Sequence, residues 1–134
     1  MASKFQSVIY NAINNRCCIE ILYQRNSLTD TNRISYIRVE PHLLGVHKKT
    51  NNTLLVAYCL PTPEQRTLKQ EFKFKDYNTE KILDIKVCYG SLFDPRPSYK
   101  PNNNRFIRVF AKVAPISKPS GTKVLPMLNC IFIW

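Results

Sequence analysis

Glycine is scarce in this sequence, with only Gly45, Gly90 and Gly121 in 134 residues. The phosphate-binding loops of P-loop proteins and of dinucleotide-binding folds need several glycines at fixed spacing, and neither pattern occurs. Any nucleotide must therefore be held mainly by side chains. Acidic residues are also few, nine against twenty lysines and arginines, and the formal charge of +11 favours an anionic partner.

Paired metal ligands are missing as well. The five cysteines form no C-x-x-C spacing, and His42 and His47 have no cysteine beside them. The acidic residues contain no D-x-D pair, which makes a metal-dependent nuclease hard to build. Cys59 and Cys88 lie in apolar runs, where a buried thiol is inert. We expect no metal, no cofactor and no enzyme activity.

A secretory signal is not apparent, and the odd number of cysteines indicates reduced thiols in a cytoplasmic protein. Residues 124–134 are strongly apolar, but Pro126 and Asn129 interrupt them and a membrane span needs about twenty residues. We expect no membrane partner. The predicted domain is 1–113, followed by a Pro/Ser-containing linker and apolar tail over 114–134. The tail can add a strand, cover an apolar patch or mediate self-association.

One helix is predicted near the N-terminus. Apolar side chains recur at helical spacing from Phe5 to Ile13. Ser3 and Gln6 fit a capping box at its start, and the Asn-Asn-Arg run at 14–16 predicts its end.

Beyond residue 16 the apolar side chains alternate, which is typical of strands. Pro41 is expected at an edge or a bulge. The expected strands cover residues 19–23, 34–39 with a continuation over 43–46, 53–60, 71–75, 82–89 and 106–113. This pattern predicts a mainly β fold with an N-terminal helix, either a small barrel or a strongly bent antiparallel sheet.

Six segments, in order, resemble the WYL domain, a bacterial and phage regulatory module. They are Ile9–Ile13, Ile19–Tyr23, Arg38–Gly45, Leu54–Cys59, Phe72–Phe74 and Phe93–Asn102. The resemblance covers about residues 5 to 113 and implies an Sm-like, SH3-type β-barrel. The Trp and Tyr of the family's name fall on Thr53 and Leu54, and only Leu55 is retained.

In that family the module is usually fused to a winged helix-turn-helix and senses nucleotides or single-stranded nucleic acid through a basic pocket. The resemblance implies ligand-binding roles for Arg38, His42, Tyr58, Arg66 and Lys73, since cations neutralise phosphates and rings stack on bases. Each also fits an ordinary role: solvated cations for the arginines and the lysine, a core ring for the tyrosine, a backbone hydrogen bond for the histidine. We expect any DNA-reading domain to come from a partner chain.

A second basic and aromatic set, Arg105, Phe106, Arg108 and Phe110, interleaves charge with rings as single-strand binders do. An edge strand with one solvated face is the alternative. The sequence thus favours a non-enzymatic ligand-sensing module in transcriptional or defence regulation that binds nucleotide or single-stranded nucleic acid. The other hypothesis is a protein-interaction or homo-oligomerisation module that uses a basic surface and the apolar tail.

Overall fold

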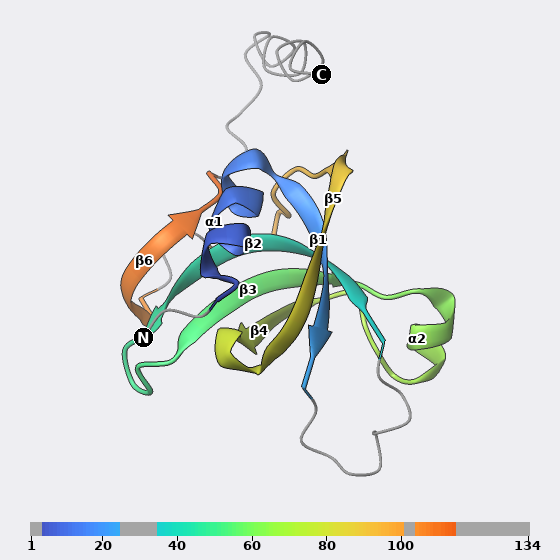
Figure 1. Cartoon of the computed structure of the whole chain (residues 1–134), viewed down its shortest axis with the longest axis horizontal. Coiled ribbons are helices and arrows are strands. Elements are labelled where there is room, and N and C mark those ends of the chain that lie inside the picture. The colour runs from blue at the N-terminus through green and yellow to red at the C-terminus, as the bar shows by residue number, and fades with distance from the viewer. Residues whose placement is uncertain (1–3, 25–34, 101–103, 115–134) are drawn as a thin grey trace, which may run out of the picture.

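The architecture is mainly β with one N-terminal helix, as the alternation of apolar residues predicts (Figure 1). A computed structural model describes residues 4–24, 35–100 and 104–114. Its elements in chain order are α1 (Gln6–Asn15), β1 (Cys17–Tyr23), β2 (Ile37–His47), β3 (Thr53–Leu60), α2 (Pro63–Thr67), β4 (Phe74–Asn78), the 3-10 turn η2 (Thr79–Lys81), β5 (Ile82–Leu92) and β6 (Phe106–Lys112).

The central strand is β2, which has three antiparallel neighbours. The sheet order is β4-β3-β2-β1-β5, with β6 also on β2. Strand β3 pairs along one edge of β2, so β1 and β6 share the other edge, β1 at Ile37 to Val39 and β6 at Leu43 to His47. Three register shifts along β2 bend it strongly. Within the described residues β4 and β5 do not pair with each other, so the sheet is strongly bent and is not closed into a barrel.

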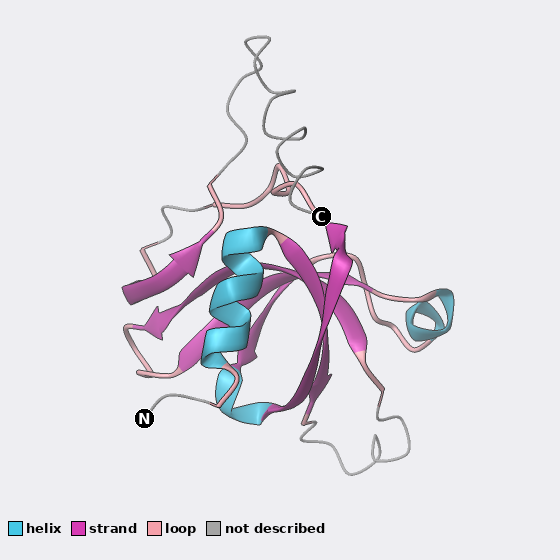
Figure 2. Ribbon diagram, turned by 45° about the horizontal axis from the view of Figure 1, so that its top comes forward, coloured by secondary structure: helices cyan, strands magenta, loops and turns pink. Residues whose placement is uncertain are grey.

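The core lies between α1 and the inner face of this bent sheet (Figure 2). The helix buries Ile9, Ala12 and Ile13, the stripe that its sequence predicts. The sheet contributes side chains that are almost fully buried: Ile19, Ile21, Val39, Leu44, Leu55, Ala57 and Cys59. Each such aliphatic side chain contributes roughly 1.5–3 kcal/mol on burial, so this layer holds the helix against β1, β2 and β6.

The ends of α1 differ in how well the sequence predicts them. The helix stops where expected, because Arg16 adopts a left-handed conformation with φ of 54°. Its start is different: Phe5 occupies the N-cap position and makes no side-chain capping hydrogen bond. Ser3, the other half of the predicted capping box, lies outside the described residues, as does the tail from 115 onward.

Two elements correct the sequence-based prediction. The strand expected at 71–75 runs instead from Phe74 to Asn78, because Tyr77 is buried and its hydroxyl lies 2.7 Å from the Cys59 sulfur. The second is α2, a short helix that the expected elements do not include. Thr62 and Gln65 form a reciprocal capping box at its start, and Pro63 occupies the first turn.

Strand β2 also begins later than expected, at Ile37 rather than Ile34, and then runs without a break through Pro41. The register shift between Pro41 and Leu43 is the bulge that a proline inside a sheet requires. The hairpin loop between β2 and β3 is closed by Asn51, which donates its N–H to the His47 carbonyl at 2.8 Å. In the part of the chain described, no helix has the length and apolar character to cross a bilayer.

Gly45 permits the close approach of β6 to β2. A Cβ atom at this position would lie 2.6 Å from the Arg108 carbonyl oxygen, a backbone atom that cannot turn away. We expect Gly45→Ala to lower the free energy of unfolding by about 1–3 kcal/mol in urea titrations. Gly90→Ala is the matched control, because no heavy atom lies within 4 Å of its Cβ position. Equal stability of the two variants would contradict the close approach.

Candidate functional site

The segment after β5, residues 93–100, folds back over the outer face of the sheet. Phe93 donates its N–H to the carbonyl of Arg16 at 3.0 Å, and Tyr99 donates its N–H to the carbonyl of Arg96 at 3.0 Å. Phe93, Pro95 and Tyr99 are buried. We call residues 93–100 the strap, because it crosses β2 and closes one side of the pocket described below.

A bidentate ion pair fixes the strap to β2. The Arg96 guanidinium donates from Nε and Nη2 to the two carboxylate oxygens of Glu40, at 2.7 and 2.9 Å. The Glu40 side chain is only 7% exposed, whereas Arg96 is 36% exposed. The same guanidinium lies 4.3 Å from the centroid of the Tyr58 ring. Glu40 raises the pKa of Arg96 above its ordinary value, so the guanidinium stays charged.

His42 is the bulge residue of β2 and makes a second connection to the strap. Its Nε2 atom accepts the backbone N–H of Arg96 at 3.1 Å, so the ring proton sits on Nδ1, which donates to the Glu40 carbonyl at 2.8 Å. The rings of Phe74, Phe93 and Tyr99 surround the imidazole, with centroids 4.8–5.1 Å away. Burial lowers the pKa of His42, which keeps the ring neutral.

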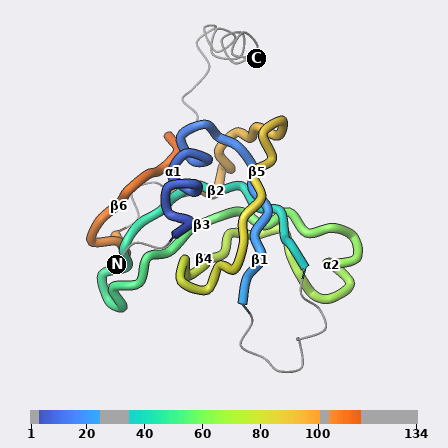
Figure 3. Tube along the Cα trace, viewed as in Figure 1, coloured from blue at the N-terminus to red at the C-terminus, as the bar shows by residue number. Residues whose placement is uncertain are grey.

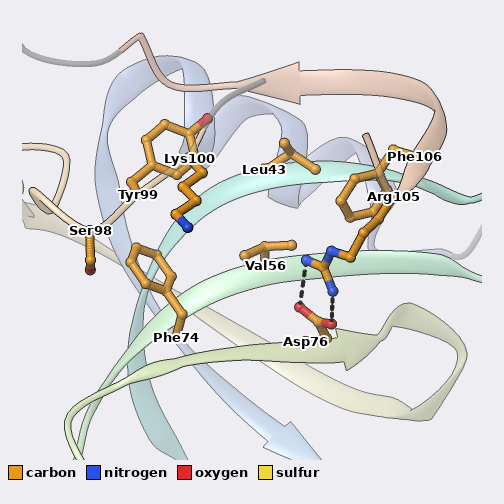
Figure 4. A pocket seen from close by; sticks show the side chains of 9 residues that line it. All are labelled: Leu43, Val56, Phe74, Asp76, Ser98, Tyr99, Lys100, Arg105 and Phe106. Atoms are coloured by element: carbon orange, nitrogen blue, oxygen red, sulfur yellow. Dashed lines mark hydrogen bonds and ion pairs between the residues drawn. The ribbon is translucent and has the colours of Figure 1, made fainter. Parts of the chain in front are cut away.

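A pocket of about 330 Å³ opens beside this cluster. Its lining combines an apolar floor and aromatic walls with cations at the rim: Leu43, Val56, Phe74, Asp76, Ser98, Tyr99, Lys100, Arg105 and Phe106 (Figure 4). The strap supplies three of these residues, and β2, β3, β4 and the start of β6 supply the rest. The pocket is thus assembled from distant parts of the chain and depends on the strap being in place.

Charge in the pocket is divided between its two sides. On one side Arg105 donates to both oxygens of Asp76, at 2.6 and 3.3 Å. On the other, the Lys100 side chain reaches toward Phe74 and is exposed (Figure 4). Burial raises the pKa of Tyr99 to about 12, so its hydroxyl remains a neutral donor. The pocket therefore carries two cations and one carboxylate around three rings.

Two of the five residues in the first predicted set lie behind the pocket and do not line it. His42 is fully buried and contacts the pocket rings Phe74 and Tyr99. Tyr58 is half-buried, with its ring 5.2 Å from Phe74 in an edge-on arrangement. Tyr58 is therefore not a fully buried core ring, and its exposed side supports the Arg96 guanidinium. Direct ligand contact by either residue stays a prediction.

The three cations of that set lie outside the pocket lining. Arg38 pairs with Glu20 at 3.4 Å on the outer face of β2. Arg66 lies over the Phe72 ring, 5.4 Å from its centroid, near α2. Lys73 pairs with Glu71 at 3.3 Å, and both are exposed. Figure 3 shows α2 at the opposite side of the molecule from β6. None of the five residues of the first set lines the pocket.

The second predicted set fits the pocket better. Arg105 and Phe106 both line it. Arg108 is exposed, and Phe110 packs against the core, because two register shifts between β6 and β2 break the alternation of faces. For the same reason Ile107 and Val109 are exposed, whereas Ala111 and Val113 are buried.

Comparisons with known proteins give no family. No model of a known protein family matches the chain, and no curated protein matches it either. Within residues 4–24, 35–100 and 104–114, no group of three or more His, Cys, Asp or Glu side chains is placed to hold a metal ion.

Several residues of the site, in the ion pair beside the pocket and in the pocket itself, were missed by sequence reasoning. Arg96 stands between two prolines, a setting that fixes its backbone, and Glu40 lies between Val39 and Pro41 in a strand, where a carboxylate needs a partner. These two signals together point to the ion pair. Asp76, Tyr99 and Lys100 carried no comparable signal, because they meet only when the strap crosses the sheet.

The Glu40–Arg96 pair gives a stability prediction. Arg96→Met keeps the aliphatic stem but leaves a buried carboxylate without its partner, so we expect a loss of about 2–4 kcal/mol in unfolding free energy. The double variant Glu40→Met with Arg96→Met should recover part of that loss. Arg108→Ala, at an exposed arginine, is the control and should change stability by less than about 0.5 kcal/mol. An Arg96→Met protein as stable as wild type would contradict the pairing.

His42 gives a pH prediction. Its folded-state pKa lies below the unfolded value, so its stabilising contribution is full above the unfolded pKa of about 6.5 and is lost as the pH falls towards the folded pKa. We expect thermal unfolding between pH 7.5 and 5.5 to show this loss in wild type and in His47→Gln, and a smaller pH slope in His42→Gln. An unchanged slope in His42→Gln would rule out His42 as the titrating group.

Proposed function

We propose that this protein is a non-enzymatic module that binds a nucleotide or single-stranded nucleic acid in the pocket between the strap and β4. The observation that supports it is the pocket lining: Phe74, Tyr99 and Phe106 offer ring surfaces, and Lys100 and Arg105 offer positive charge at the rim. A volume of about 330 Å³ falls within the usual range for small-molecule sites.

The chemistry of the pocket divides between base and phosphate. Aromatic stacking contributes about 1–3 kcal/mol per base and tolerates any base, because every base has a π face. Phosphate oxygens would bind Lys100 and draw Arg105 from Asp76, since a phosphate is a bidentate acceptor like the carboxylate it replaces. The formal charge of +11 adds long-range attraction for the same class of ligand.

The resemblance to the WYL domain supports the same proposal from a separate direction. The bent sheet with its N-terminal helix fits an Sm-like or SH3-type barrel that is left open between β4 and β5, and we propose that relationship for the fold. In this proposal the protein is a cytoplasmic regulator whose partner chain supplies DNA reading. Arg38, Arg66 and Lys73, which lie outside the pocket, then extend the basic surface along which a longer strand would run.

Polarisation titrations with short labelled oligo(dT), oligo(U) and a labelled ATP test the proposal. Arg105→Gln and Lys100→Gln should each weaken binding and lower the slope of affinity against salt by about one. Phe106→Leu should weaken binding with little change in that slope, because it removes stacking and no charge. Asp76→Asn should strengthen binding, because it removes the carboxylate that competes for Arg105.

Lys69→Gln is the matched control, since Lys69 is an exposed cation in the connection between α2 and β4 and lies outside the pocket lining. It should reproduce the wild-type affinity. If all single-charge removals, Lys69 included, weaken binding equally, the interaction is diffuse and the pocket is not the site. Failure of all three probes to bind would overturn the proposal.

A further inference from the structure

Strand β5 is the longest uncovered edge in the described structure. It pairs with β1 from Ile82 to Leu92, and none of the other described strands pairs with its opposite edge. Figure 2 shows β5 running across the front of the sheet, in front of β1. The strand contains no proline, and no described strand uses the backbone groups along this edge. Such an edge is a template for pairing with another chain.

The side chains of β5 separate charge from apolar surface. Asp84 and Lys86 lie on the outer face with Tyr36, whose hydroxyl donates to Asp84 and whose ring centroid lies 4.1 Å from the Lys86 amine. Ile85 and Val87 lie on the other face, half-buried at the margin of the core. Strand β5 also exposes Leu83 by 47% and Tyr89 by 74%. Its apolar face is thus only partly covered.

The sequence from Leu83 to Val87 is apolar–acidic–apolar–basic–apolar, so it has the same character in both directions. In an antiparallel pair of two identical strands centred on Ile85, Asp84 of each copy lies opposite Lys86 of the other. The ladder between β1 and β5 shifts register at Leu83, so the match rests on residues 84 to 86. Residues directly opposite share a face, so charges meet opposite charges and apolar side chains meet apolar ones.

We propose that the outer edge of β5 binds β5 of a second copy of this chain, in an antiparallel pair with a two-fold axis through Ile85. Other registers do not give this match. Centring the pair on residue 84 or 86 places like charges opposite each other, and every other centre leaves both charges without an opposite partner. The interface is isologous and closed, which gives a dimer and no filament.

This dimer is independent of the proposed ligand. The pocket is lined from β2, β3, β4, the strap and the start of β6 and by no residue of β5, so pairing through β5 uses none of the lining residues. The apolar face of β5 gains cover from the second copy at Ile85 and Val87. The edge that is exposed in the monomer is thereby paired along its centre.

Sedimentation of the full chain over a range of concentrations tests the proposal. Wild type should reach twice the monomer mass of 15.6 kDa. In Lys86→Asp, Asp84 of each copy would lie opposite the new acidic residue at position 86 of the other copy. This repulsion occurs twice in the dimer and should raise the dimer dissociation constant by about tenfold or more. Adding Asp84→Lys restores opposite charges in the reversed order and should restore dimerisation. Lys69→Asp, which makes the same charge change outside β5, should leave it unchanged.

The double exchange separates the interface from effects within one chain. Contacts of Tyr36 with Asp84 and Lys86 are altered in both the single and the double variant, so only pairing between copies explains recovery. Ile85→Cys should also form a disulfide with itself under mild oxidation, whereas Leu92→Cys at the end of the strand should not. A monomeric wild type, a dimer that persists in Lys86→Asp, or a double variant that remains monomeric would each overturn the proposal.

Discussion

The bulge at His42 is the constraint on which the candidate site depends. A proline inside β2 forces a register shift, and the shift turns His42 into the cluster of rings instead of into the ladder. The backbone carbonyl of His42 then accepts the N–H of Val113 at 2.9 Å, and its ring accepts the N–H of Arg96 at 3.1 Å. One residue therefore ties the central strand to the chain beyond β6 and to the strap.

Electrostatics and packing act together at this point. The attraction between Glu40 and Arg96 would by itself stabilise the strap little, because the buried carboxylate loses its hydration and that loss offsets the Coulombic gain. Here Arg96 keeps part of its surface in water and rests on Tyr58, while Glu40 receives two charge-assisted hydrogen bonds. The strap then delivers Tyr99 and Lys100 to the pocket at fixed positions, so a ligand need not order that segment on binding.

How far the sequence predicts this structure depends on the range of the interactions. Helix α1 and strands β1, β3, β5 and β6 follow from local periodicity, and the bulge follows from Pro41. The position of β4 does not follow from local periodicity, because Phe72 and Phe74 alternate with lysines and so favour a strand that begins earlier. Burial of Tyr77 against Cys59 places the strand at Phe74–Asn78 instead. The pocket was predictable only through Arg105 and Phe106. Its remaining residues come together through the strap, whose path depends on a pair 56 positions apart in sequence.

The central claim is that the pocket formed by the strap, β2, β3 and β4 binds nucleic acid or nucleotide through stacked rings and rim cations. Ultraviolet crosslinking of the full chain to a short oligonucleotide carrying a photoreactive uridine, followed by peptide mapping, tests it most directly. The account predicts crosslinks to peptides that contain Phe74, Tyr99 or Phe106. Crosslinks confined to α2 or β5, with none in these peptides, would contradict it.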